Sequence, residues 1–249
     1  MLVFHALQLL LGIDLRLPFH LASILLAPAM AIYAATAFSL RFSAFASAFL
    51  LLGGLGVEVL GTRTGFPFGQ YFYTGVFKPQ LFGVPLQIPV GWLTLGIMCY
   101  SIASLNFRGR PNRLLASAAL MVMWDLLYDP LFVALGMWAW SQREYFGVPF
   151  SNFACWFIVS FAFFLALDII SGGKATPRTN ATTTAPLAVY LAYALDGVIS
   201  NAFDRRSAAG GGRRCLRHDD RLAGGERAFF AGLDRTWIDQ LLTKPKASR

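Results

Sequence analysis

Long uncharged stretches, separated by short polar connections, dominate the first 200 residues. The hydrocarbon core of a bilayer is about 30 Å thick, so a helix needs about 20 mostly apolar residues to cross it. Five stretches meet this requirement, at residues 19–40, 42–60, 89–106, 113–131 and 149–170. Two more, at 1–15 and 186–201, are shorter or less apolar. The pattern predicts an all-α fold, a polytopic membrane bundle of five to seven transmembrane helices.

The connections between these spans differ in charge, and the difference predicts their orientation. The turn at 108–113 carries three arginines and is the most basic short connection. Because lysine and arginine mark the cytoplasmic side, we expect this turn inside the cell. Alternation of the spans then puts Arg41 and the connection around Arg178 inside as well. The two remaining connections, 61–88 and 132–148, share the opposite side, whichever way the protein is inserted.

The composition supports a membrane protein with a separate basic tail. Only 14% of the 249 residues are charged, whereas soluble domains have about 25%. The formal net charge is +8, but residues 204–249 hold 11 of the 21 basic residues and 6 of the 13 acidic ones. We therefore expect a transmembrane helical domain at 1–203 and a basic tail at 204–249. The tail is expected to be disordered, or to form an amphipathic helix over 226–242 that lies on anionic lipid.

The same features set the expected location and partners. The chain should be an integral, multi-pass protein of a bacterial cell membrane, in contact with the lipid bilayer. The first 203 residues hold only 10 basic and 7 acidic residues. These charges are too few and too scattered to follow a phosphate backbone, so no nucleic-acid partner is expected.

Metal and cofactor chemistry finds little support in the sequence. The cysteines and histidines are few and lack metal-ligand spacing; they are Cys99, Cys155, Cys215, His5, His20 and His218. No glycine-rich motif for a dinucleotide or a phosphate occurs. We therefore expect an activity that needs neither a metal nor a cofactor.

Three acidic residues, Glu58, Asp125 and Asp129, lie within predicted spans or near their ends. A charge inside a membrane is costly, and its presence by default indicates a functional site. Asp125 and Asp129 are four residues apart, so both carboxyl groups should lie on one helix face, one turn apart. Glu58 should lie at a similar depth, towards the side that holds the connections 61–88 and 132–148.

Structural roles remain open for these carboxyls. Each could instead pair with Arg63, with Arg143 or with a backbone amide, since buried charges are usually paired whatever their role. Asp168, at the cytoplasmic end of its helix, is expected to be an interfacial charge.

The two connections opposite the basic turn are rich in glycine, proline and aromatic residues. Such non-helical backbone is tolerated at membrane depth only where it lines a cavity or is buried in protein. Aromatic ring faces attract cations, and a carboxyl desolvated among aromatic rings can serve as an acid. Aromatic walls with a few carboxyls suit a long apolar substrate that reacts through a carbocation.

Several ordered motifs are similar to those of a known membrane family. They are Glu58-x-x-Gly61, Gly65-Phe66-Pro67-Phe68-Gly69-Gln70-Tyr71-x-Tyr73, Gly83-Val84-Pro85-Leu86 with Trp92, Asp125-x-x-x-Asp129-Pro130, Trp138-x-Trp140, and Tyr145-Phe146-Gly147-Val148-Pro149-x-x-Asn152-Phe153. Over residues 40–170 the chain resembles the integral-membrane carotenoid biosynthesis proteins, which include carotenoid 1′,2′-hydratases and archaeal bisanhydrobacterioruberin hydratases. It departs from them at Cys155, where a glycine is usual before the tryptophan, and in the arginine-rich sequence after Asp204.

This resemblance implies addition of water to the terminal C1′=C2′ bond of a carotenoid ψ-end, such as that of γ-carotene or lycopene, without a redox cofactor. The product would carry a tertiary 1′-hydroxyl. One carboxyl would protonate C2′ and a second would deprotonate the attacking water. The expected pair is Asp129 and Glu58, supported by Asp125. The residues expected to bind the substrate are Tyr71, Tyr73, Trp92, Trp138, Tyr145 and Asn152.

Two other functions remain open. A lycopene-cyclase-like isomerase would begin with the same protonation, but the polyene would capture the cation in place of water. A non-catalytic carotenoid-binding scaffold for other enzymes of the pathway would bind pigment without needing any carboxyl.

Overall fold

The computed structural model describes residues 16–75, 78–142, 144–172, 177–178 and 183–209. The chain divides into two units, Met1–Asp204 and Arg205–Arg249. The first unit contains all the structure discussed below, apart from the last residues of its final helix. The amphipathic helix expected over 226–242 lies outside the described residues.

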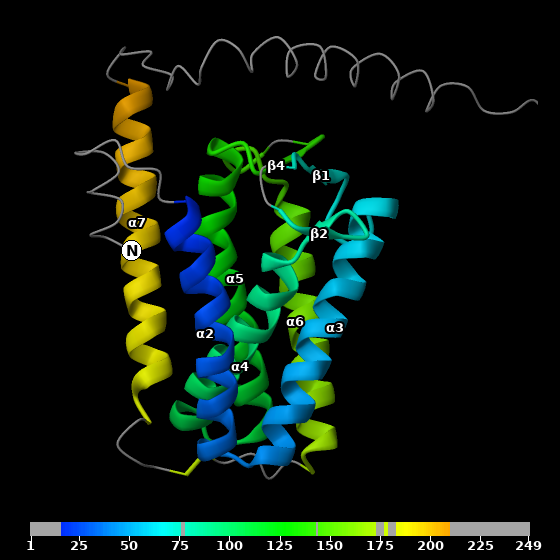
Figure 1. The fold of residues 1–249 in the computed structure, drawn as a ribbon, viewed down its shortest axis with the longest axis vertical. Helices are drawn as coiled ribbons and strands as arrows, with labels where there is room; N and C mark the ends of the chain where they lie inside the picture. Colours follow the sequence, from blue (N-terminus) through cyan, green and yellow to red (C-terminus); the bar gives the residue numbers. More distant parts are fainter. Residues whose placement is uncertain (1–15, 76–77, 143, 173–176, 179–182, 210–249) are drawn as a thin grey trace, which may run out of the picture. The chain divides into compact units, whose positions relative to one another are not determined.

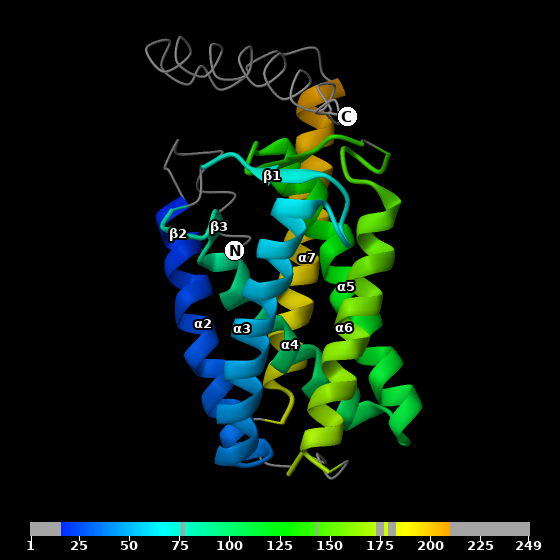
Figure 2. The same cartoon turned by 90° about the vertical axis from the view of Figure 1, so that its right-hand side faces the viewer.

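Six helices make up most of the described part of the chain (Figures 1 and 2). They are α2 (Arg16–Ala37), α3 (Leu40–Thr64), α4 (Gln87–Asn106), α5 (Arg110–Ala134), α6 (Phe150–Ile170) and α7 (Ala185–Ala209). Four of them, α3 to α6, are long and apolar enough to cross a membrane. The expected membrane helix bundle is confirmed. Helix α7 extends past the domain boundary expected at residue 203.

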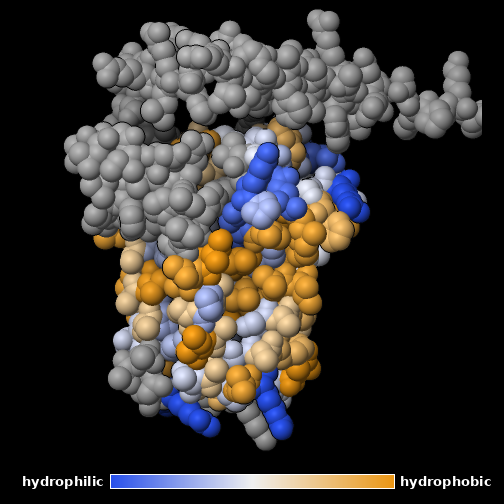
Figure 3. Space-filling model, in the orientation of Figure 1, coloured by the Kyte–Doolittle hydropathy of each residue, from blue (hydrophilic) through white to orange (hydrophobic). Residues whose placement is uncertain are grey.

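Helix α4 lies at the centre and packs against α2, α3 and α5. Of its most apolar 18 residues, 72% are buried in the protein, whereas α3 and α6 bury 28%. Apolar side chains such as Leu52 on α3 and Ile158 on α6 are exposed, as a lipid-facing surface requires. Figure 3 shows apolar side chains over the middle of one face, with hydrophilic ones gathered near the two ends.

Local sequence signals set where these helices begin and end. The Ser39 hydroxyl accepts a hydrogen bond from the Phe42 amide at 3.1 Å and caps the start of α3. At the other end of α3, Gly65 adopts a left-handed conformation with φ of 76°, and its amide donates to the Gly61 carbonyl. Proline occupies the first turn of α4 at Pro89 and of α5 at Pro111, where its missing N–H costs nothing.

The short strands of the described residues lie at one end of the helices (Figures 1 and 2). Strand β1 (Tyr71–Tyr73) pairs antiparallel with β4 (Trp138–Trp140), while β2 (Gln80–Leu81) and β3 (Val84–Pro85) form a hairpin. The β1–β4 pairing joins the two aromatic connections directly, although more than 60 residues separate them in the chain. The sequence predicted an ordered, non-helical backbone here but not this pairing.

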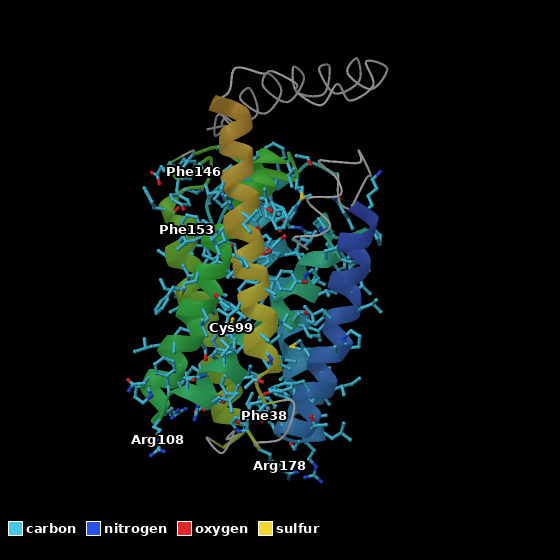
Figure 4. All side chains as sticks on the ribbon, turned by 90° about the vertical axis from the view of Figure 1, so that its left-hand side faces the viewer. Phe38, Cys99, Arg108, Phe146, Phe153 and Arg178 are labelled. Atoms are coloured by element: carbon cyan, nitrogen blue, oxygen red, sulfur yellow. The ribbon has the colours of Figure 1, made fainter. Side chains whose placement is uncertain are left out.

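The basic connections lie at the opposite end. Figure 4 shows Arg108 and Arg178 at one end of the helices and Phe146 at the other. The two aromatic connections therefore share one end, as the alternation of spans predicted.

Asp168 lies at the basic end, but it is not the interfacial charge expected from the sequence. Its carboxylate is fully buried and pairs with Arg113 and with Arg110, whose Nε lies 2.6 Å from Oδ2. The Tyr100 hydroxyl donates to Oδ1 at 3.1 Å. These contacts join α4, α5 and α6, because desolvated charges are stable in a protein only when paired and hydrogen-bonded.

Chemical labelling can test the arrangement of the two ends. In a background without native cysteines, Gln80→Cys and Gln142→Cys should react with a membrane-impermeant maleimide from the same side of sealed vesicles, and Arg108→Cys only from the other. All three should react after detergent treatment. Labelling of Gln80→Cys and Gln142→Cys from opposite sides would contradict the shared end.

A second test concerns Asp168. Asp168→Asn leaves the buried Arg113 guanidinium without its counter-charge, which typically costs about 3–5 kcal/mol. We expect a large loss of thermal stability in detergent, measured by unfolding of the purified protein. Arg108→Gln, an exposed change at the same end, should have little effect. Equal stability of the two variants would show that the buried pair does not support the fold.

Candidate active site

A cavity of about 120 Å³ is lined by residues of all six helices and of strands β1 and β4. Three carboxyl groups, those of Glu58, Asp125 and Asp129, line it together with Asn152. Most of the remaining wall is aromatic: Phe68, Tyr71, Tyr73, Trp92, Trp124, Phe132, Trp138, Trp140, Trp156 and Tyr193. The structure therefore brings together carboxyls that the sequence could place only at similar depth.

Glu58, on α3, is almost completely buried and accepts hydrogen bonds from three side chains. The hydroxyls of Tyr71 and Tyr73 donate to Oε2 at 2.6 and 2.7 Å, and the Trp92 indole donates to Oε1 at 3.1 Å. Burial, and then the nearby Glu58 charge, raises the pKa of both tyrosines, so their hydroxyls remain protonated donors. Glu58 is therefore held by neutral donors, not by Arg63.

Asp125 and Asp129 lie on one face of α5, as their spacing predicted. The Asn152 side-chain amide, in the first turn of α6, donates to Oδ2 of Asp125 at 3.0 Å and to Oδ2 of Asp129 at 2.8 Å. All three side chains are buried. Among the described residues, the ion pairs involve Asp168 and neither of these two carboxyls.

The β1–β4 pairing builds the aromatic wall next to Glu58. Tyr71 stands opposite Trp140 in the ladder and Tyr73 opposite Trp138. The first pair of rings is stacked with centroids 5.6 Å apart, and the second meets edge to face at 5.8 Å. The Trp140 indole also donates to the Phe68 carbonyl at 3.2 Å, which ties the two connections together. These four rings line the same small cavity as the carboxyls.

A second pair of rings, from two helices, forms another part of the cavity wall. Trp92 on α4 and Trp156 on α6 stack in parallel, with centroids 4.3 Å apart and planes 4° apart. Gly54 on α3 makes room for this pair, because a Cβ there would lie 2.5 Å from Cγ of Trp92. The glycine therefore lets the indole approach Glu58 on the same helix.

In the described part of the chain, no group of three or more His, Cys, Asp or Glu side chains is arranged to hold a metal ion. The arrangement can hold and move a proton among carboxyls and can stabilise a cation against aromatic faces.

Comparison with known proteins gives the family. The family model described as "Carotenoid biosynthesis protein" matches residues 19–212, most of the chain. The chain belongs to the carotenoid biosynthesis protein family. No solved structure is significantly similar to it.

One curated member of similar sequence is a protein of Haloarcula japonica named bisanhydrobacterioruberin hydratase. The two are 35% identical over 114 residues, which make up 44% of this chain and 39% of the relative. The chain thus matches well under two thirds of the relative's length.

Tyr145 and Asn152, which were both expected to bind the substrate, differ in where the structure places them. Tyr145 is not among the residues that line the cavity; its ring packs edge to face on Phe146 and Phe153, with centroids 4.8 and 5.5 Å away. Asn152 lines the cavity, but its amide group is already bonded to the two aspartates. Its side-chain nitrogen is therefore placed to orient both carboxyls.

Other residues line the site without having been predicted from the sequence. Trp140 lines the cavity with Trp138, and the two-residue spacing of a strand could have indicated that both face one side. Tyr193, on α7, also lines the cavity. On the same helix, the buried Asp196 accepts a hydrogen bond from Tyr128 of α5 at 3.2 Å. No local pattern in 186–201 marks these contacts.

The close packing of Trp92 on Gly54 can be tested by substitution. Gly54→Ala should displace the Trp92 indole and lower stability, although alanine is the better helix former by about 1 kcal/mol. Gly56→Ala, two residues away, meets nothing within 4 Å and should be neutral or slightly stabilising. Tryptophan fluorescence and thermal unfolding in detergent measure both effects. A neutral Gly54→Ala would contradict the packing of Trp92 on α3.

Proposed function

We propose that this protein is a carotenoid hydratase, which adds water to the terminal C1′=C2′ bond of a ψ-end of the γ-carotene or lycopene type. The product carries a tertiary 1′-hydroxyl. The observation that carries the proposal is the convergence of three buried carboxyls on one aromatic cavity inside an apolar helix bundle.

The cavity suits the end of a long apolar molecule. Its wall is mostly aromatic, and helices α3 to α6 are apolar enough to lie in a bilayer, where a carotenoid dissolves. Protonation of C2′ produces a tertiary cation at C1′. Ring faces such as those of Tyr71, Trp92 and Trp140 stabilise that cation, and the nearby carboxylates add opposite charge.

Polar groups for a water molecule support hydration over cyclisation. Oδ1 of Asp125 and Nε1 of Trp138 are buried without a hydrogen-bond partner among the described residues, and both side chains line the cavity. An acceptor and a donor of this kind are what an ordered water needs, since a buried water usually makes two to four hydrogen bonds. A cyclase, by contrast, must exclude water from its cation.

The family relationship supports the same reaction class. The Haloarcula japonica relative is named as a hydratase, and the match includes 44% of this chain. The reaction would take place in a bacterial cell membrane, with the cavity carboxyls acting as acid and base.

Expression in a bacterium that accumulates γ-carotene or lycopene tests the function. We expect a new, more polar carotenoid whose mass exceeds that of its precursor by one water, measured by chromatography with mass spectrometry. An isomer of unchanged mass would indicate a cyclase, and bound but unaltered pigment would indicate a binding protein.

Asp129→Asn should accumulate in the membrane but form little product, because an amide cannot exchange a proton as the carboxyl does. The expected decrease in product formation is about 10²–10⁴-fold.

The same assay in isolated membranes tests for cofactors. Hydration transfers no electrons, so activity should persist after washing with a chelator and without nicotinamide or oxygen. A strict requirement for oxygen or for an added metal would exclude simple hydration.

A further inference from the structure

The three carboxyls of the cavity have different hydrogen-bond partners. Glu58 accepts hydrogen bonds from three side chains: an indole N–H on Oε1 and two tyrosine hydroxyls on Oε2. An indole cannot accept a hydrogen bond. The Tyr71 hydroxyl lies 2.6 Å from the carboxylate but 3.4 Å from the Glu58 carbonyl, so its proton is directed to the carboxylate. Three donors on one carboxyl stabilise its ionised form.

A proton on Glu58 would disturb this arrangement. On Oε1 the new proton would meet the Trp92 indole, which cannot accept it, and on Oε2 a tyrosine hydroxyl would have to turn and accept, so that its own proton loses the carboxylate as acceptor. An unsatisfied buried donor is costly, typically about 1–3 kcal/mol. Glu58 is therefore poorly placed to take up and release a proton during a reaction.

Asp125 and Asp129 have the opposite surroundings. They share one donor group, the Asn152 amide, which bonds one oxygen of each. Oδ1 of Asp125 has no hydrogen-bond partner in the described part of the chain. Two neighbouring carboxyls in a buried site cannot both ionise easily, and such pairs hold one proton between them.

We infer that Asp125 and Asp129 share one exchangeable proton and act together as both acid and base, whereas Glu58 remains ionised as a fixed counter-charge for the cation. This assignment rests on the proposed hydratase function. It differs from the pairing of Asp129 with Glu58 expected from the sequence, and it gives Asn152 the role of a positioning residue.

The reaction balances with this division of roles. The aspartate pair gives its proton to C2′; the π electrons of C1′=C2′ form the new C2′–H bond, and C1′ becomes cationic. The oxygen of water then bonds to C1′, and a proton of that water passes to the aspartate pair. The pair thus returns to its starting state without any other reactant. Glu58 exchanges no proton and stabilises the positive charge between the two steps.

Infrared spectroscopy tests the protonation states without requiring any activity. In membranes containing the wild-type protein, we expect the band of a protonated buried carboxyl, identified by its shift in D₂O. The band should persist in Glu58→Gln and be altered or lost in both Asp125→Asn and Asp129→Asn. Loss of the band in Glu58→Gln, absence of the band in the wild type, or a band unaffected by either aspartate change would overturn the inference.

The pH dependence of hydration tests the roles during turnover. Glu58→Gln should lower the rate by about 10²–10³-fold, as removal of a single electrostatic contact to a transition state does, but should keep the shape of the pH profile. Tyr73→Phe should have a smaller effect with the same unchanged shape. Asp125→Asn and Asp129→Asn should each change the shape. Tyr190→Phe, which removes a hydroxyl bonded to the Leu120 carbonyl, is the matched control and should behave as wild type.

The two experiments separate the inference from the proposed function. If the wild type forms no hydroxylated product but the infrared pattern is as expected, the hydratase proposal fails and the shared proton stands. If the wild type hydrates its substrate but Glu58→Gln changes the pH profile while both aspartate variants retain it, hydration stands and the division of roles is wrong.

Discussion

Burial of carboxyl groups among apolar helices is the constraint on which the rest of this structure depends. A carboxylate in such a setting needs hydrogen-bond donors or a counter-charge, since no bulk water solvates it. Glu58, Asp125 and Asp129 meet this need with neutral donors: two tyrosines, a tryptophan and an asparagine. The strands at that end of the bundle and the start of α6 supply three of these donors, so the strand pairing and the carboxyl cluster depend on each other.

At the opposite end of the helices, ion pairs stabilise a buried carboxylate. Asp168 is as deeply buried as Asp125, yet it pairs with Arg110 and Arg113. The two guanidinium groups supply the counter-charge that a buried carboxylate needs. Buried carboxyls thus have different surroundings at the two ends: ion pairs that join helices at one end, and neutral donors beside a cavity at the other.

Close packing determines how near these groups lie. Gly54 allows Trp92 to reach Glu58, and Gly61 lets the Tyr71 hydroxyl approach, because an ideal Cβ at Gly61 would lie 2.7 Å from it. The Trp92 indole also stacks on Trp156, which restricts its position further. Small residues on α3 therefore set the distances around Glu58, although none of them carries a polar side chain.

The sequence by itself determined the membrane helices, the shared end of the two aromatic connections and the placement of Asp125 and Asp129 on one helix face. These features follow from hydropathy and from the helical repeat, which act over short distances in the chain. Only the tertiary structure decided which residues meet Glu58, why Tyr145 does not line the cavity while Trp140 and Tyr193 do, and that Asp168 is buried in an ion pair. Those contacts depend on the register of two strands more than 60 residues apart and on the packing of helices. A single sequence does not specify such distant pairings, because many arrangements bury the same apolar residues equally well.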